Sequence, residues 1–96
     1  MPLYYELNRV FHSHENSINA VRFNKAGTLI TSGDVDGRLC IWEKEGGRLV
    51  LNELLSSPIV AIEWYEFAEE TLLVGLRNGR VFVYALNPVQ CIQPES

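Results

Sequence analysis

Apolar residues along this chain occur in short runs that are separated by turn-forming residues. Runs of this length, rich in Val, Ile, Leu and aromatic residues and bounded by Gly, Asp or Asn, predict β-strands rather than helices. The first four predicted strands cover residues 18–23, 28–32, 39–42 and 48–54. The segments between them supply the turns, with glycine at positions that favour a positive φ.

A second set of four strands follows the first. It covers residues 59–64, 71–75 and 81–84, and ends in a short strand over residues 89–92. Asn78-Gly79 takes the hairpin position between two of these strands. Several strands, such as Leu72-Leu73-Val74, are apolar at successive positions, so both faces of their sheet must be covered. We therefore expect antiparallel sheets that stack on other sheets.

The two sets of strands are an internal repeat. Matching residues stand 42 positions apart in the central part of each set: Gly33 and Gly75, Gly37 and Gly79, Arg38 and Arg80, Trp42 and Tyr84. Upstream, residues 18–23 match residues 59–64 at an offset of 41. The change of offset places a one-residue insertion in the turn at residues 65–70.

The repeat resembles the WD-repeat family, whose units of about forty residues build β-propeller blades. The resemblance rests on a His before the first strand and on the spacing from Ser32 through Gly37 to Trp42. It implies a structural hydrogen-bond cluster of a His, a Ser, an Asp and a Trp, which here would be His14, Ser32, Asp36 and Trp42. The second repeat is degenerate, because Val74, Asn78 and Tyr84 replace the Ser, Asp and Trp, and we expect packing alone to hold it.

The fold predicted from this resemblance is all-β, with two four-stranded antiparallel propeller blades of the WD-repeat type. Residues 14–54 would be the first repeat, residues 55–96 the second, and residues 1–13 the outer strand of a preceding or neighbouring blade. Propellers close with four to eight blades, so two blades are incomplete alone. They would be part of a larger propeller or would assemble into one as a homo-oligomer.

Charge, apolar segment length and cysteine content limit the classes of partner and the location that we expect. A net charge of −4, with the eight Lys and Arg residues scattered, leaves no basic stripe for nucleic acid. No segment has the apolar length of a membrane span. Cys40 and Cys91 stand among apolar residues and are expected to be free thiols, which fits an intracellular location, cytoplasmic or nuclear.

Catalytic and metal sites are not predicted. Ser32, His14 and Asp36 have the residue types of a catalytic triad, but no Gly-x-Ser-x-Gly sequence surrounds Ser32 and the same residues form the family's structural cluster. His12 and His14 supply only two zinc ligands, and no Cys-x-x-Cys completes the set. We therefore expect no enzyme activity, no metal and no cofactor.

The predicted function is a scaffold that binds other proteins through loops on one face of a propeller. By resemblance, the loops between the second and third strands and between repeats carry this face, with Arg77 as the best anchor. Its expected residues are Glu15, Asn16, Asp34, Val35, Leu76, Arg77 and Asn78. An alternative function is the binding of small ligands, such as glycans, between the blades of an oligomeric propeller.

Overall fold

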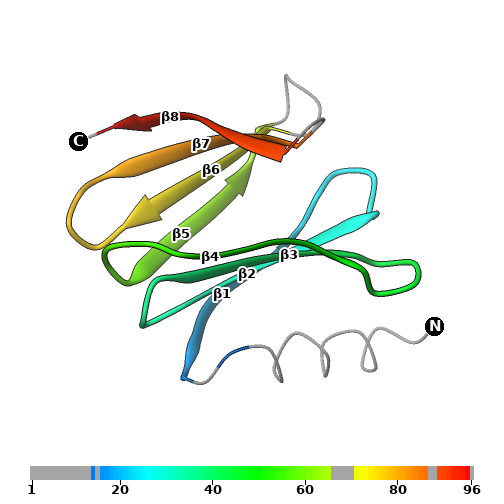
Figure 1. Ribbon diagram of the computed structural model, residues 1–96, viewed down its shortest axis with the longest axis horizontal. Helices are drawn as coiled ribbons and strands as arrows, with labels where there is room; N and C mark the ends of the chain where they lie inside the picture. The colour runs from blue at the N-terminus through cyan, green and yellow to red at the C-terminus, as the bar shows by residue number, and fades with distance from the viewer. Residues whose placement is uncertain (1–13, 15, 66–70, 87–88, 96) are drawn as a thin grey trace.

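The protein folds into two sheets, each of four antiparallel strands in chain order (Figure 1). The structure, a computed structural model, describes residues 14, 16–65, 71–86 and 89–95, the last of these ranges for its backbone alone. The first sheet contains β1 (Ile18–Phe23), β2 (Leu29–Asp34), β3 (Arg38–Glu43) and β4 (Leu49–Leu54). The second contains β5 (Ile59–Trp64), β6 (Thr71–Leu76), β7 (Val81–Leu86) and β8 (Val89–Glu95). The prediction of two four-stranded antiparallel sheets is confirmed.

The internal repeat extends to irregularities of the backbone. The pairing of β1 with β2 shifts register between Ile18 and Ala20, and that of β5 with β6 shifts between Ile59 and Ala61. The pairings of the third strand with the fourth shift in the same way, after Ile41 in one sheet and after Val83 in the other. Both sheets therefore share one pattern of bulges as well as one order of strands.

Several strand ends differ from those predicted by one to three residues, and the ends of β8 and β2 bear on the site. β8 runs to Glu95, so the prediction of a short fourth strand over residues 89–92 was wrong. Its final residues are polar and include Pro94, which an edge strand tolerates because one side of its backbone is unpaired. β2 runs to Asp34, two residues beyond the predicted end. Residues 1–13, predicted as the outer strand of another blade, lie outside the described residues.

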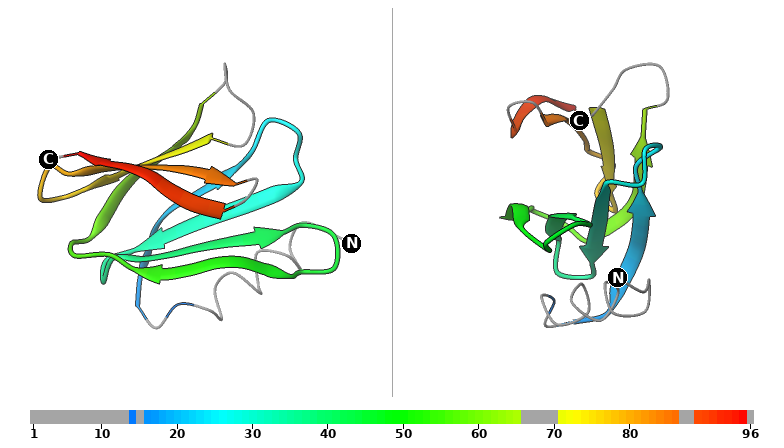
Figure 2. Two further views of the ribbon diagram at one scale, coloured as in Figure 1. Left: turned by 45° about the horizontal axis from the view of Figure 1, so that its top comes forward. Right: turned by 90° about the vertical axis from the view of Figure 1, so that its right-hand side faces the viewer.

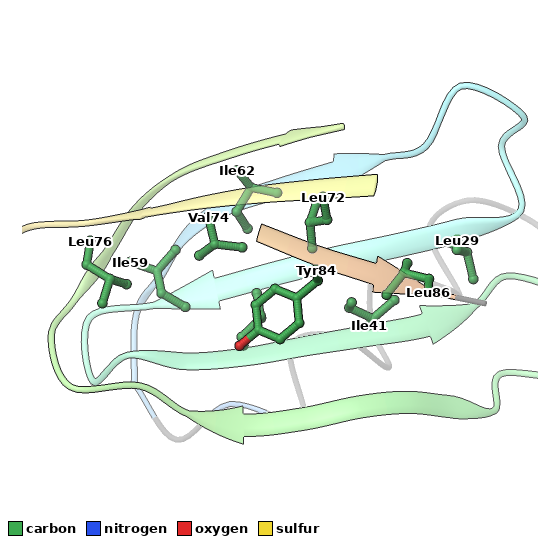
Figure 3. Packing of buried hydrophobic residues seen from close by; sticks show 10 residues of the cluster. Leu29, Ile41, Ile59, Ile62, Leu72, Val74, Leu76, Tyr84 and Leu86 are labelled. Carbon is green, nitrogen blue, oxygen red and sulfur yellow. The ribbon is translucent and has the colours of Figure 1, made fainter. Parts of the chain in front are cut away.

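The main core lies between the two sheets, which face each other in the views of Figure 2. Apolar side chains of β5, β6 and β7 point toward β2 and β3 (Figure 3). The buried members of this cluster are Leu29, Leu39, Ile41, Ile59, Ile62, Leu72, Val74, Leu76, Tyr84 and Leu86. Fully burying one such side chain contributes roughly 1.5–3 kcal/mol, so this contact dominates the stability of the pair of sheets.

Hydrogen bonds also join the sheets. Asn19 Nδ2 donates to the Ile59 carbonyl at 3.0 Å, and Arg22 Nε donates to the Ile62 carbonyl at 3.4 Å. The Tyr84 hydroxyl donates to Glu53 Oε2 at 2.8 Å. The second repeat is therefore not held by packing alone, as we had expected, because the residue in the Trp position uses its hydroxyl to bind the first sheet.

Candidate functional site

A buried polar cluster joins the segment before β1 to the end of β2. Ser32 and Asp34 stand two residues apart, so their side chains share one face of β2. His14 bridges them: its Nδ1 lies 2.7 Å from Asp34 Oδ2 and its Nε2 lies 2.6 Å from Ser32 Oγ. All three residues are buried, Ser32 completely.

Asp34 also fixes the turn between β2 and β3. Its Oδ1 accepts the backbone N–H groups of Asp36 and Arg38, both at 2.9 Å. Burial alone would raise the pKa of the Asp34 carboxyl, but the hydrogen bonds from His14 and from these two backbone groups outweigh it and hold the pKa below its ordinary value. The carboxylate is thus a charged anchor at the base of the turn.

This geometry corrects the predicted cluster. The carboxylate beside His14 belongs to Asp34, whereas Asp36 is exposed and accepts a hydrogen bond from Asn16 Nδ2 at 2.7 Å. The reason is the longer β2, which keeps Asp34 on the strand and leaves Asp36 in the turn. Trp42 also differs, because its buried Nε1 has no hydrogen-bond partner among the described residues. His14 and Ser32 do lie together.

The three side chains have the chemical types of a Ser-His-Asp triad but lack a reactive surface. Ser32 is 0% exposed, so no substrate carbonyl can reach its Oγ while the fold is intact. What the arrangement can do is hold the chain before β1 against the β2–β3 turn. In the described part of the chain, no three His, Cys, Asp or Glu side chains are grouped to hold a metal ion, and His12 lies outside that part.

Three connections meet at one end of the two sheets, at the left of Figure 1: the β2–β3 turn, the β4–β5 segment and the β6–β7 turn. Backbone hydrogen bonds tie them together. The Leu55 amide donates to the Gly37 carbonyl at 2.8 Å, and the Arg77 amide donates to the Pro58 carbonyl at 2.9 Å. We call this the loop end; its exposed or half-exposed side chains include Asn16, Val35, Asp36, Ser57, Arg77 and Asn78.

Gly37 lets two of these loops approach closely. Its φ is 94°, and a Cβ there would lie 2.6 Å from the Ser57 carbonyl oxygen and 2.7 Å from that of Leu55. No side chain fits at such distances, and the backbone conformation favours glycine as well. The β2–β3 turn is therefore packed directly on the backbone that joins the two sheets.

The predicted interaction face agrees with the loop end only in part. Asn16, Val35, Arg77 and Asn78 are exposed there, whereas Asp34 and Leu76 are buried at 1% and 3% exposure and present no surface to a partner. Each is the last residue of its strand: Asp34 ends β2 and anchors the following turn, and Leu76 ends β6 and packs in the core. Glu15 lies outside the described residues. No sequence pattern pointed to Ser57, whose Oγ accepts a hydrogen bond from the Asn78 backbone amide at 3.2 Å.

Comparison with known protein families identifies the repeat to which the strands of the first sheet belong. The model of the WD domain, G-beta repeat, matches residues 5–43, which include His14, Ser32 and Trp42. The chain carries a WD repeat. The match ends with β3, the third strand of a WD-repeat blade, and the second sheet repeats the strand order and bulges of that blade.

Individual relatives of this WD-repeat chain are much longer than the chain itself. Pre-rRNA-processing protein pro-1 of Caenorhabditis briggsae is 32% identical over 62% of this chain and 11% of the relative. Ribosome biogenesis protein ERB1 of Phaeosphaeria nodorum is 27% identical over 90% of the chain and 11% of the relative. Actin-interacting protein 1 of Drosophila melanogaster is 30% identical over 77% of the chain and 13% of the relative. The chain thus spans a small fraction of each relative.

No helix among the described residues is long and apolar enough to span a bilayer.

Proposed function

We propose that this chain is a protein-interaction scaffold and that its loop end is the recognition surface. Residues 14–54 and 55–96 act as two blades, which further blades of a longer chain or other copies complete into a propeller. The observation that carries the proposal is the meeting of three connections at one end of a rigid pair of sheets, with side chains that face solvent. Binding residues held on loops by such a scaffold are the usual arrangement in recognition domains.

The chemistry of the loop end supports a protein partner. Val35 presents an apolar side chain that is 38% exposed, and Arg77 and Asn78 are exposed on the β6–β7 turn. An apolar contact surrounded by Arg and amide groups is typical of protein interfaces. The anchor from His14 to Asp34 fixes the turn before binding, which reduces the entropy that binding must offset.

The relatives support a role in binding rather than in one particular reaction, because they are named for different processes. Their names refer to pre-rRNA processing, ribosome biogenesis and interaction with actin, while each relative matches more than half of this chain. These names are consistent with an intracellular role, in the nucleus or the cytoplasm. We further propose that the chain has no catalytic role of its own, in keeping with the complete burial of Ser32.

The test compares proteins captured from a cell extract by the immobilised chain and by two variants. One variant combines Val35→Ser with Arg77→Glu at the loop end, and the other carries Lys25→Glu in the β1–β2 turn at the opposite end of the first sheet (Figure 1). Both should keep the melting temperature of the parent, since the three residues are exposed.

The loop-end variant should lose the specifically captured proteins by about tenfold or more, since truncating an anchor residue at an interface costs on the order of 1–2 kcal/mol. The Lys25→Glu variant should retain them. Equal capture by all three chains, or equal loss in both variants, would refute the proposal.

A further inference from the structure

The two repeats close the loop end with contacts at matching positions but of different chemistry. The repeat offset of 41 residues makes Asn16 the counterpart of Ser57, and the offset of 42 makes Asp36 the counterpart of Asn78. In the first repeat, Asn16 Nδ2 donates to Asp36 Oδ2 at 2.7 Å. In the second, the Asn78 backbone amide donates to Ser57 Oγ at 3.2 Å. The side chain before the first strand is thus a donor in one repeat and an acceptor in the other.

The backbone beside these contacts is the same in both repeats. The Val35 amide donates to the Ser17 carbonyl at 3.1 Å, and the Arg77 amide donates to the Pro58 carbonyl at 2.9 Å. Serine is shorter than asparagine, so the serine of the second repeat reaches only the backbone of the facing turn, whereas the asparagine of the first reaches a side chain. A larger acidic group on the serine would extend to the side chains of the β6–β7 turn.

The β6–β7 turn presents donors for such a group. Arg77 stands where the first repeat has Val35, so a guanidinium replaces an apolar side chain. Arg77 is exposed, and among the described residues no carboxylate pairs with it. It precedes Asn78, whose amide contacts Ser57 Oγ, so its long side chain can reach a group attached to that oxygen. A guanidinium is always charged and binds phosphate through two parallel hydrogen bonds.

The β4–β5 segment offers Ser57 to a modifying enzyme. Ser57 is the one serine or threonine of the sequence that precedes a proline, the arrangement on which proline-directed protein kinases act. Its side chain is half-exposed, and Ser56 beside it is exposed. Within the described part of the chain neither serine makes a backbone hydrogen bond, since those of the segment come from Leu55 and Pro58. Few bonds must therefore break when the segment opens locally toward an enzyme.

We propose that Ser57 is a phosphorylation site of a proline-directed kinase and that its phosphate binds Arg77, which withdraws this side chain from partners of the loop end. Ser57 Oγ attacks the γ-phosphorus of ATP, an O–P bond forms as the bond from that phosphorus to ADP breaks, and the hydroxyl proton passes to the base of the kinase. The effect on partners rests on the proposed function. The contact between the phosphate and Arg77 does not.

The charges at the loop end favour this contact. A serine phosphate carries a charge of about −1.5 to −2 at pH 7 and has three acceptor oxygens. The Asn78 amide and the Arg77 guanidinium can both donate to it, and charge-assisted hydrogen bonds of this kind are the stronger class. The exposed carboxylate of Asp36 repels the phosphate, but salt screens this repulsion between groups that are not in contact. Attraction to Arg77 therefore prevails.

The first experiment locates the modification. The folded chain and two variants, Ser57→Ala and Ser56→Ala, are incubated with ATP and a purified mitogen-activated protein kinase, and phosphate uptake is followed by mass spectrometry. The parent and Ser56→Ala should each gain one phosphate, and Ser57→Ala should gain none. An unmodified parent, or equal uptake by Ser57→Ala, would overturn the site.

The second experiment tests the contact with Arg77 without any partner. Phosphorus NMR follows the second ionisation of the phosphate in the phosphorylated parent and in phosphorylated Arg77→Gln. The guanidinium should hold the pKa of the phosphate below its ordinary value of about 6, and Arg77→Gln should return it toward that value. The same pKa in both chains would overturn the contact.

The third experiment measures the consequence for binding. Phosphorylation should reduce the proteins captured from a cell extract by about tenfold or more in the parent and cause no further loss in Arg77→Gln. Unchanged capture by the phosphorylated parent would overturn the regulatory role. Equal capture by the unphosphorylated parent and unphosphorylated Arg77→Gln would overturn Arg77 as an anchor in the proposed function, and with it the effect on partners, while the contact measured by NMR would stand.

Discussion

Replacing Gly33 by alanine should weaken the contact between the two sheets. The added Cβ would lie 2.5 Å from Ile59 Cγ2, and Ile59 is completely buried, so neither backbone nor side chain can move aside freely. Overpacking of this kind costs about 1–3 kcal/mol. For a domain of this size, each kcal/mol lowers the melting temperature by roughly 4–8 °C.

Urea and thermal unfolding of three chains measure this effect: the parent, Gly33→Ala and Gly75→Ala. Gly75→Ala is the matched control, because its Cβ would sit 3.5 Å from the nearest atom and alanine restricts the unfolded chain, which stabilises by about 0.4–1 kcal/mol. Combining Gly33→Ala with Ile59→Ala should destabilise less than the sum of the two single changes. A Gly33→Ala chain within about 0.5 kcal/mol of the parent would refute the packing of β5 on β2.

Three further predictions concern the buried polar groups. Asp34→Ala should lower the free energy of unfolding by about 2–4 kcal/mol, because it leaves three hydrogen-bond donors unpaired. Asp36→Ala should change this free energy by less than about 0.5 kcal/mol. Urea unfolding of both variants decides which acid anchors the turn. Because the folded-state pKa of Asp34 lies below its ordinary value, its ionisation contributes stability above about pH 4 that is lost as the pH falls through the folded-state pKa. Urea midpoints between pH 3 and 6 should therefore fall less steeply for Asp34→Asn than for the parent, and parallel profiles would contradict this assignment. Thr31→Val should raise the melting temperature, because the buried Thr31 hydroxyl has no hydrogen-bond partner within the part of the chain that the structure describes and its removal gains about 1 kcal/mol; a lower melting temperature would show that the hydroxyl is paired.

Much of the fold could be predicted because the apolar pattern repeats. The matching glycines and aromatic residues 42 positions apart defined two equal units, and successive apolar residues such as Leu72-Leu73-Val74 required both faces of a sheet to be covered. The end of β8 could not be read from this pattern. Its last residues, Gln93, Pro94 and Glu95, contain no run of apolar side chains, so they carry no hydrophobic signal.

The candidate site was harder to predict, because two acids stand two residues apart. Asp34 and Asp36 would both point to the same side of an extended strand, and the position of the turn decides which one lies beside His14. The apolar pattern determines the ends of a strand less well than its centre. The same uncertainty placed Leu76 on the surface, whereas β6 extends by one residue and carries Leu76 into the core.

Amide hydrogen exchange of the chain alone and bound to a captured partner tests the central claim most directly. The account predicts that binding protects the amides of residues 35–37, 55–57 and 77–79, which make up the loop end. Protection confined to the turns at the opposite end, residues 24–27 and 44–47, would show that the chain recognises its partners through a different surface and would contradict the account.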